Sequence, residues 1–386
     1  MRHADLKPLS EQVLVITGGS SGIGLTTARL AVEHGARVVL AARNEQVQQR
    51  IVDELNDLIP EHAVAVIADV SQEADVRRIA DTAVNRFGGF DTWVNNAAVS
   101  IYGPIMEIPL EDQRRLFEVN YWGYVYGSRI AIEHLRDRDH GRGGALINVG
   151  SVIGDRAIPD QGPYCASKHA IKGFTEALRM EVEQEGWPVS ISLIKPSSID
   201  TPYKAHAKNL LERKPKNPPP VYAPQTVAKA ILHCAQYPRR DVFVGGGGRA
   251  VAAIGWLLPR LTDLVMERTM RNLQMTDTPA EPIDREHHSL YKPIEDGDER
   301  GHYPHYVHET SAYTLAALHP YLTAAATLAA GLVARQAWQM LAGEHDRGRP
   351  VGSAERESRA RHARRPVPAR VGAARPPVGM RAGEPL

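Results

Sequence analysis

The chain has 386 residues, of which 43% are hydrophobic and 24% charged, an ordinary composition for a globular protein. Its two cysteines exclude a disulfide framework and a CxxC metal site, and residues 1–12 lack the apolar run of a signal peptide, so we expect a cytoplasmic protein. The net charge of +1 combines a basic tail, with ten arginines and three acidic residues from Arg347 onward, and a mildly acidic remainder.

A nucleotide-binding unit is predicted near the N-terminus. The β-branched run Val13–Ile16 indicates a buried strand, which leads into a glycine-rich loop, a helix over Leu25–His34 and a second strand over Ala36–Ala41. Glycines between a strand and a helix let the backbone approach a pyrophosphate, and the helix N-terminus supplies unpaired N–H groups. The cofactor-binding residues expected in this loop are Thr17, Gly18, Ser20, Ser21, Gly22, Ile23 and Gly24.

The end of the second strand predicts which nicotinamide cofactor is used. An acidic residue there would accept hydrogen bonds from both ribose hydroxyls and repel a 2′-phosphate, but this sequence has Ala42 and Arg43. A guanidinium can hold a phosphate through a charge-assisted hydrogen bond of about 1.5–3 kcal/mol. NADP(H) is therefore favoured over NAD(H), the alternative being that Arg43 is a surface arginine.

Alternating strands and helices predict the fold class: α/β, a Rossmann-type doubly wound parallel sheet with helices on both faces. Asp69 and Asn96 fall at the C-terminal ends of strands, where ligands bind in such sheets. Asp69 could accept a hydrogen bond from an adenine amino group or cap the following helix. The elements after Arg43 are a helix over Glu45–Leu58, a strand over Ala63–Ala68, a helix over Glu73–Phe87 and a strand from Thr92.

A Tyr and a Lys four residues apart form the candidate catalytic pair. Tyr164 and Lys168 lie one turn apart on a predicted helix, which brings an ammonium group near a phenol. The cation would lower the phenol pKa from its usual value of about 10 and make it a proton donor and acceptor near neutral pH. Such a pair alone is more often a solvated helix face, so this interpretation depends on the rest of the chain.

Two other polar residues stand out. Asn120 lies inside a helix predicted over Arg114–Leu135, where Asn is unfavourable, so it either lies on the surface or faces the cleft. Ser151 follows a strand predicted over Gly144–Val149. The remaining expected strands are Ser190–Lys195 and Val242–Val244.

Together these motifs resemble the short-chain dehydrogenase/reductase family of the classical type, over roughly residues 10–245. The resemblance implies that Tyr164 exchanges a proton with the substrate oxygen, and that Lys168 lowers the tyrosine pKa and holds the nicotinamide ribose. It also implies that Ser151 hydrogen-bonds the substrate oxygen and that Asn120 holds a water that links Lys168 to solvent. The matching segments are Thr17–Gly24, Asn95–Ala98, Asn120, Ser151 and Tyr164–Lys168.

The same resemblance implies further cofactor contacts and one departure. Pro196 is followed by Ser197 where the family usually has glycine, which we interpret as an altered loop near the nicotinamide. Substrate identity is expected to depend on residues 203–224 and 100–109, whose Tyr and Ile content suggests a partly apolar substrate. The implied cofactor contacts beyond the glycine-rich loop are Arg43, Asp69, Val70, Asn96, Ala97, Tyr164, Lys168, Pro196, Ile199 and Thr201.

The chain continues beyond the expected catalytic domain, residues 1–248. Within a helical extension over 249–345 we expect an amphipathic helix over Arg249–Leu273 and a polar arm or linker over Thr276–His308. The apolar residues expected on one side of that helix are Trp256, Leu257, Leu261, Leu264 and Val265.

The end of the extension raises the question of membrane contact. The uncharged run Thr310–Ala334 is long enough to span a bilayer but is mainly alanine. A hairpin, a membrane-surface contact, or packing against the body or a second subunit is favoured over a span. Residues 346–386 are expected to be a disordered basic tail.

These features predict an NADP(H)-dependent oxidoreductase that interconverts a secondary alcohol and a ketone. The family resemblance implies a homodimer or tetramer that associates through the helices around residues 114–135 and 164–183. We expect no metal site and no specific nucleic-acid binding. The alternatives are an NAD(H)-dependent or epimerase-type member of the same family, and a non-catalytic NADPH-binding regulatory protein. The intact set of Asn120, Ser151, Tyr164 and Lys168 argues against the regulatory alternative.

Overall fold

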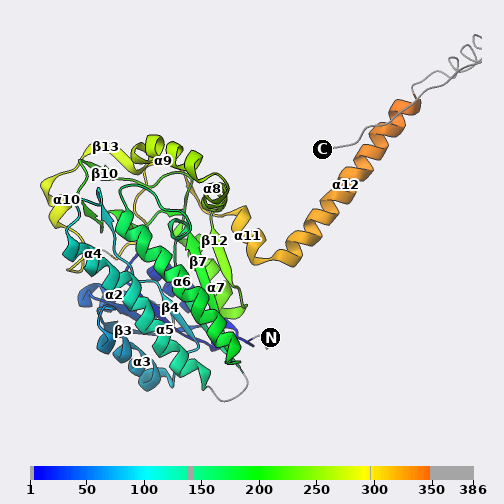
Figure 1. Ribbon diagram of the computed structural model, residues 1–386. Helices are drawn as coiled ribbons and strands as arrows, with labels where there is room; N and C mark the ends of the chain where they lie inside the picture. Colours follow the sequence, from blue (N-terminus) through cyan, green and yellow to red (C-terminus); the bar gives the residue numbers. More distant parts are fainter. Residues whose placement is uncertain (1–3, 138–141, 296, 348–386) are drawn as a thin grey trace, which may run out of the picture. The chain divides into compact units, whose positions relative to one another are not determined.

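A seven-stranded, entirely parallel sheet forms the centre of the computed structural model, which describes residues 4–137, 142–295 and 297–347 (Figure 1). The strand order is β12-β7-β6-β4-β1-β2-β3. All five residues of β1 are buried, which explains its continuous apolar sequence. The strands are β1 (Val13–Thr17), β2 (Arg37–Ala42), β3 (Ala63–Ile67), β4 (Thr92–Asn95), β6 (Gly144–Val149), β7 (Val189–Pro196) and β12 (Asp241–Val244).

Helices cover both faces of this sheet and bury an apolar layer on each side. On one face lie α1 (Gly22–Glu33), α2 (Glu45–Leu58) and α7 (Pro224–Gln236). On the other lie α3 (Glu73–Phe87), α5 (Gly123–Arg136) and α6 (Gly162–Gln184). The doubly wound Rossmann-type fold expected from the sequence is therefore confirmed.

The strand order places a topological switch point between β1 and β4. From β1 the chain proceeds through β2 and β3 on one side, and then returns to β4 on the other side of β1. The carboxyl ends of β1 and β4 consequently border the crevice in which sheets of this kind bind ligands. The glycine-rich loop follows β1, and Asn96 follows β4.

Short strands bring later parts of the chain to this edge of the sheet. The pair β5 (Ile101–Tyr102) and β9 (Lys208–Asn209) joins the two stretches predicted to set substrate identity. A second group consists of β8 (Ser198–Ile199), β11 (Val221–Tyr222) and β14 (Val307–His308). A third pair is β10 (Arg213–Pro215) with β13 (Met275–Pro279). The shorter 3₁₀ helices are η1 (Leu9–Glu11), η3 (Val152–Gly154) and η4 (Pro202–Lys204).

The helix predicted over residues 114–135 is not continuous. It begins earlier, as α4 (Leu110–Phe117), and joins α5 through a π-helical turn, η2 (Glu118–Trp122). The π turn contains Asn120. Such turns are rare and often occur at functional sites. Local periodicity predicted a helix correctly but could not reveal the π-helical turn within it.

The single amphipathic helix predicted over residues 249–273 is wrong. The segment forms two helices, α8 (Gly246–Leu257) and α9 (Pro259–Gln274), because Pro259 cannot continue the hydrogen bonding of α8 but suits the first turn of α9. Its apolar residues also do not form a buried face: Trp256 is 82% exposed, Leu257 65% and Leu261 54%. Within α9 the most buried side chains are Thr262, Met266 and Gln274.

The chain divides into two compact units, residues 1–320 and residues from 321 onward. The first unit also includes α10 (Pro282–Glu286) and α11 (Ala312–Leu318), and α12 (Pro320–Arg347) continues into the second. In the described part of the chain no single helix is long and apolar enough to cross a membrane, and α11 with α12 meets that criterion only as a broken pair. The tail predicted to be disordered, 346–386, lies almost entirely outside the described residues.

Candidate active site

The glycine-rich loop is held against the end of β4 by side chains from both strands. The Thr17 hydroxyl accepts hydrogen bonds from the amides of Asn96 and Ala97, at 3.0 and 3.2 Å. The Asn96 side-chain amide donates to the carbonyls of Thr17 and Gly18. Gly18 has φ +66°, and a Cβ added there would lie 2.8 Å from the Ala97 Cα. Only glycine therefore allows this close approach of the two segments.

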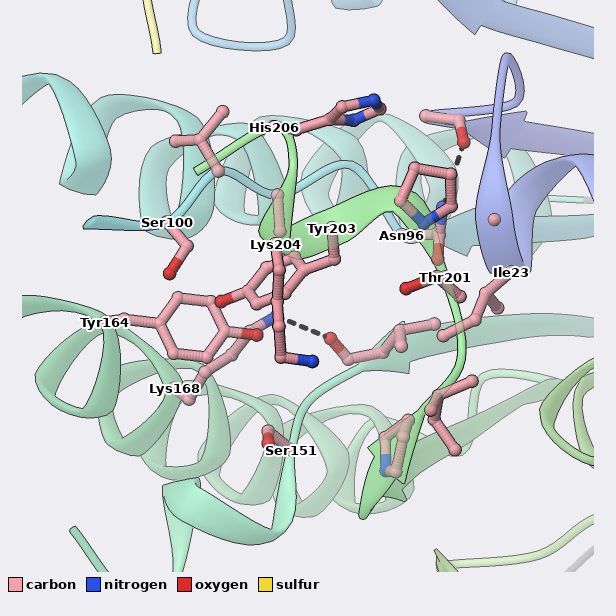
Figure 2. A pocket seen from close by; sticks show the side chains of 18 of the residues that line it. Ile23, Asn96, Ser100, Ser151, Tyr164, Lys168, Thr201, Tyr203, Lys204 and His206 are labelled. Carbon is pink, nitrogen blue, oxygen red and sulfur yellow. Dashed lines mark hydrogen bonds between the residues drawn. The ribbon is translucent and has the colours of Figure 1, made fainter. Parts of the chain in front are cut away.

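A cavity of about 450 Å³ extends from this loop to the helix that carries Tyr164 and Lys168. Figure 2 shows Tyr164, Lys168 and Ser151 toward one side of the cavity, with Ile23, Asn96 and Thr201 toward the other. The sequence-predicted residues that line it are Gly18, Ser20, Ser21, Gly22, Ile23, Arg43, Asp69, Val70, Asn96, Ala97, Ser151, Tyr164, Lys168, Pro196, Ile199 and Thr201.

Three predicted residues support the cavity without lining it. Thr17 makes the hydrogen bonds described above. Gly24 packs beneath the loop, where an added Cβ would lie only 2.0 Å from the Gly18 carbonyl oxygen. Asn120 is fully buried, accepts a hydrogen bond from the Val99 amide at 2.8 Å and donates to the Val99 carbonyl and the Ser167 hydroxyl. Asn120 therefore holds the segment after β4 against α6.

At one end of the cavity, charged groups face the position predicted for the adenosine. Arg43 donates from Nη2 to the Ser289 carbonyl, whereas its Nη1 is buried with no hydrogen-bond partner among the described residues. Burial lowers the pKa of Arg43, and nearby Asp69 opposes that shift. Burial alone would raise the Asp69 pKa, but hydrogen bonds from Arg115 and Ser71 outweigh it and lower the pKa.

At the other end, Tyr164 and Lys168 are both buried on α6. The Lys168 ammonium donates to the Val149 carbonyl at 2.9 Å and lies 5.1 Å from the ring centre of Tyr124 and 5.5 Å from that of Tyr164. Burial lowers the pKa of Lys168 to about 7. The lysine is thus held by one carbonyl and two aromatic rings, without an ion pair among the described residues.

The structure corrects the expected pKa of Tyr164. Burial raises it to about 12, and the neighbouring Tyr203 hydroxyl only partly opposes this rise. The rings of Tyr164 and Tyr203 are 5.4 Å apart. The sequence expectation counted the nearby ammonium group but not the loss of solvent around the phenol, which disfavours the phenolate.

Ser151 is the N-cap of the short helix η3 and follows β6 by two residues. Its hydroxyl accepts a hydrogen bond from the Ile153 amide at 3.3 Å, which orients the side chain at the cavity wall. The Ser151 hydroxyl lies on the same side of the cavity as the tyrosine, as Figure 2 shows.

Several cavity residues were not predicted individually. Tyr102, Tyr203, Lys204 and Asn217 come from the two stretches expected to set substrate identity, but no pattern distinguished them there. Burial lowers the pKa of Lys204 to about 7. Ser289, Pro293 and Ile294 come from the segment interpreted as a polar arm or linker, and no local signal placed them here.

The residues present fit a nicotinamide dinucleotide. The first turn of α1 faces the cavity: its Gly22 amide donates to the Asp298 carbonyl, and the Ile23 amide has no partner within the helix and can meet a diphosphate. The buried Nη1 of Arg43, which has no partner in the described part of the chain, adds a donor at the predicted 2′ position. The cavity is also long enough to join these groups to Tyr164, because all of them line one continuous space.

Comparisons with known proteins show what this chain is similar to. The short chain dehydrogenase family model matches residues 12–210. The uncharacterized oxidoreductase YxnA of Bacillus subtilis (strain 168) is 48% identical over 330 residues, 85% of this chain and 91% of that protein.

Two solved structures share the fold. A short chain dehydrogenase/reductase from Burkholderia phymatum in complex with NAD has a TM-score of 0.60 at 25% identity and covers 72% of this chain and 99% of its own. A 3-ketoacyl-(acyl-carrier-protein) reductase from Brucella melitensis complexed with NADH has a TM-score of 0.54 at 26% identity and covers 62% and 99%.

Proposed function

This chain belongs to the short chain dehydrogenase family, and we propose that it is an NADP(H)-dependent oxidoreductase that interconverts a secondary alcohol and a ketone. The observation that carries the proposal is the single cavity in which the glycine-rich loop, Arg43 and the Tyr164–Lys168 pair meet. When bound, the nicotinamide cofactor supplies or accepts the hydride. The residues of this chain would bind it, orient the substrate and move the proton.

Tyr164 would be the general acid and base. A phenol whose pKa is about 12 is protonated at neutral pH, so it can donate its proton to the alkoxide oxygen that forms when a ketone is reduced. Ser151 lines the same side of the cavity and would hydrogen-bond that oxygen. Lys168, fixed by the Val149 carbonyl, would hold the ribose next to the nicotinamide and, in its protonated form, contribute positive charge near the phenol.

Asn120 would act through its neighbours. Its side chain is committed to Val99 and Ser167, one residue before Lys168. We therefore assign it a positioning role, which keeps α6 in register with the wall of the cavity. The water-holding role implied by the family resemblance stays a prediction.

The preference for NADP(H) rests on Arg43. The solved relatives described above carry NAD and NADH, but in this chain β2 ends at Ala42 and is followed by Arg43, which retains a buried donor without a partner among the described residues. A 2′-phosphate would satisfy that donor, whereas a ribose hydroxyl would gain less from a cation.

Fluorescence titration of the purified protein with NADPH and NADH tests this proposal. Wild type should bind NADPH more tightly, and Arg43→Ala should lose about 1.5–3 kcal/mol of NADPH binding, roughly 10- to 150-fold, with little change for NADH. The matched control is Arg37→Ala, which removes a partly exposed arginine at the start of the same strand that does not line the cavity. Failure to bind either nucleotide would refute the proposed function.

A measurement of ketone reduction distinguishes an enzyme from a non-catalytic NADPH-binding regulatory protein. A protein that binds NADPH but reduces no ketone in a screen of aliphatic, cyclic and aromatic ketones would be the non-catalytic form.

Tyr203 and Tyr102 favour a partly apolar substrate, since both aromatic side chains line the cavity near Tyr164.

We also propose assembly through α5 and α6, which sedimentation or light scattering would measure. Trp122, 42% exposed, and Met180, 63% exposed, provide apolar surface next to or on these helices.

A further inference from the structure

A segment outside the part matched by the family model forms one wall of the cavity. Residues 289–295 and 297–303, here called the strap, belong to the first compact unit. Ser289, Pro293 and Ile294 of the strap line the cavity. The strap contacts the body at three places along the predicted nucleotide site.

The first contact is at the adenosine end. Arg43 donates to the Ser289 carbonyl, and Arg115 donates from Nε to the Leu290 carbonyl at 3.1 Å. Leu290 is fully buried in the apolar layer shared with α3 and α5. The strap is thus bonded to Arg43, and to Arg115, which also pairs with Asp69.

The second contact is at the N-terminal end of α1. The Gly22 amide donates to the Asp298 carbonyl at 2.9 Å. The Glu299 carboxylate then accepts from the Thr26 hydroxyl at 2.9 Å and from Arg29 at 2.6 Å. It also accepts from the Gln225 side chain, on α7, at 2.8 Å. Because the Glu299 side chain is only 17% exposed, these are the strongest polar anchors of the strap.

The third contact is at the nicotinamide end. The Tyr303 amide donates to the Asp200 carboxylate at 3.1 Å. Gly301 packs so closely on Thr201 that an added Cβ would lie 2.3 Å from its carbonyl oxygen. The chain then continues into β14, which pairs with β11.

We propose that the strap encloses the dinucleotide: its residues 289, 293 and 294 contact the bound cofactor, and Glu299 is the latch whose release limits cofactor dissociation. This inference rests on the proposed function for the identity of the ligand. A cofactor that fills the cavity lies beside a segment bonded at both of its ends and at the glycine-rich loop between them. Dissociation of the cofactor past the strap requires the hydrogen bonds between the strap and the body to break.

A stopped-flow measurement tests the latch. NADPH bound to the full chain is displaced by excess NADP⁺, and the loss of nucleotide fluorescence gives the dissociation rate. Glu299→Gln should increase that rate at least tenfold, because it removes the negative charge that holds Thr26, Arg29 and Gln225. The matched control is Glu54→Gln, which removes the other carboxylate paired with Arg29, at 2.8 Å, but from α2 rather than the strap. It should change the rate less than twofold.

Two outcomes would refute the proposed role of the strap in cofactor dissociation. One is an unchanged dissociation rate in Glu299→Gln, and the other is an equal increase in both variants. Equilibrium binding of NADPH to wild type tests the proposed function separately, since tight binding with no effect of Glu299→Gln refutes only the strap.

Hydrogen exchange of the wild-type protein provides a test that does not depend on how a variant folds. NADPH should slow exchange of the amides in 289–295 and 297–303 by at least fivefold, with no comparable change in α3, which lies away from the cavity lining. Equal exchange with and without NADPH would contradict enclosure of the cofactor.

Discussion

Removal of one oxygen atom from Tyr164 gives the sharpest test of the proposed chemistry. Tyr164→Phe retains the ring that packs 5.4 Å from Tyr203, so the cavity wall should persist. It removes the only atom of this side chain that can transfer a proton. General acid–base catalysis contributes about 10²–10⁴ in rate, which corresponds to about 2.7–5.5 kcal/mol of transition-state free energy.

The assay should separate chemistry from binding. Single-turnover oxidation of NADPH is followed with the best ketone from the screen, and NADPH affinity is measured by fluorescence titration of the same preparation. We expect the hydride-transfer rate of Tyr164→Phe to fall by about 10²–10⁴ while NADPH affinity changes less than threefold. Tyr203→Phe, which removes a buried hydroxyl from the same cavity, should lose less than tenfold. A Tyr164→Phe rate within threefold of wild type would refute the assignment of this residue as the acid.

The raised pKa and the close packing of the loop can each be tested as well. Because burial raises the Tyr164 pKa to about 12, the phenolate needed to oxidise an alcohol is scarce at neutral pH. The kcat/KM for oxidation should therefore rise nearly tenfold per unit between about pH 8 and 10, whereas a profile that is flat over this range would contradict the raised pKa. Gly24→Ala should lower the free energy of unfolding by about 1–3 kcal/mol or more, because the new Cβ would lie 2.0 Å from the Gly18 oxygen. Gly173→Ala, on an exposed helix position with no neighbour within 4 Å, should instead be neutral or slightly stabilising in thermal unfolding.

Local patterns were sufficient to predict the sheet, because each strand and helix carries its own periodicity. The helices Glu45–Leu58 and Glu73–Phe87 have the predicted bounds, and the strand Gly144–Val149 does also. Helix–helix junctions were less predictable. The π turn around Asn120 depends on contacts with neighbouring elements. The break at Pro259 has a local cause, which the prediction of one continuous helix overlooked, and the exposed side chain of Trp256 shows that the apolar residues around it are not buried.

In the candidate site, too, some features could be predicted from the sequence and others could not. The residues of the glycine-rich loop, Tyr164 and Lys168 could be predicted because backbone geometry and helical spacing impose their chemistry within a few residues. Their electrostatic state could not, since the Tyr164 pKa depends on burial by distant segments such as the one containing Tyr203.

Patterns within short stretches of the chain thus specify the parallel sheet, the loop at its switch point and the acid–base candidates. Which later segments surround them depends on the folded chain as a whole. The contact between Glu299 and Arg29 joins residues 270 positions apart, and the contact between Arg43 and Ser289 joins residues 246 apart. No local period encodes such pairs, because they depend on the path of the whole chain across the completed sheet.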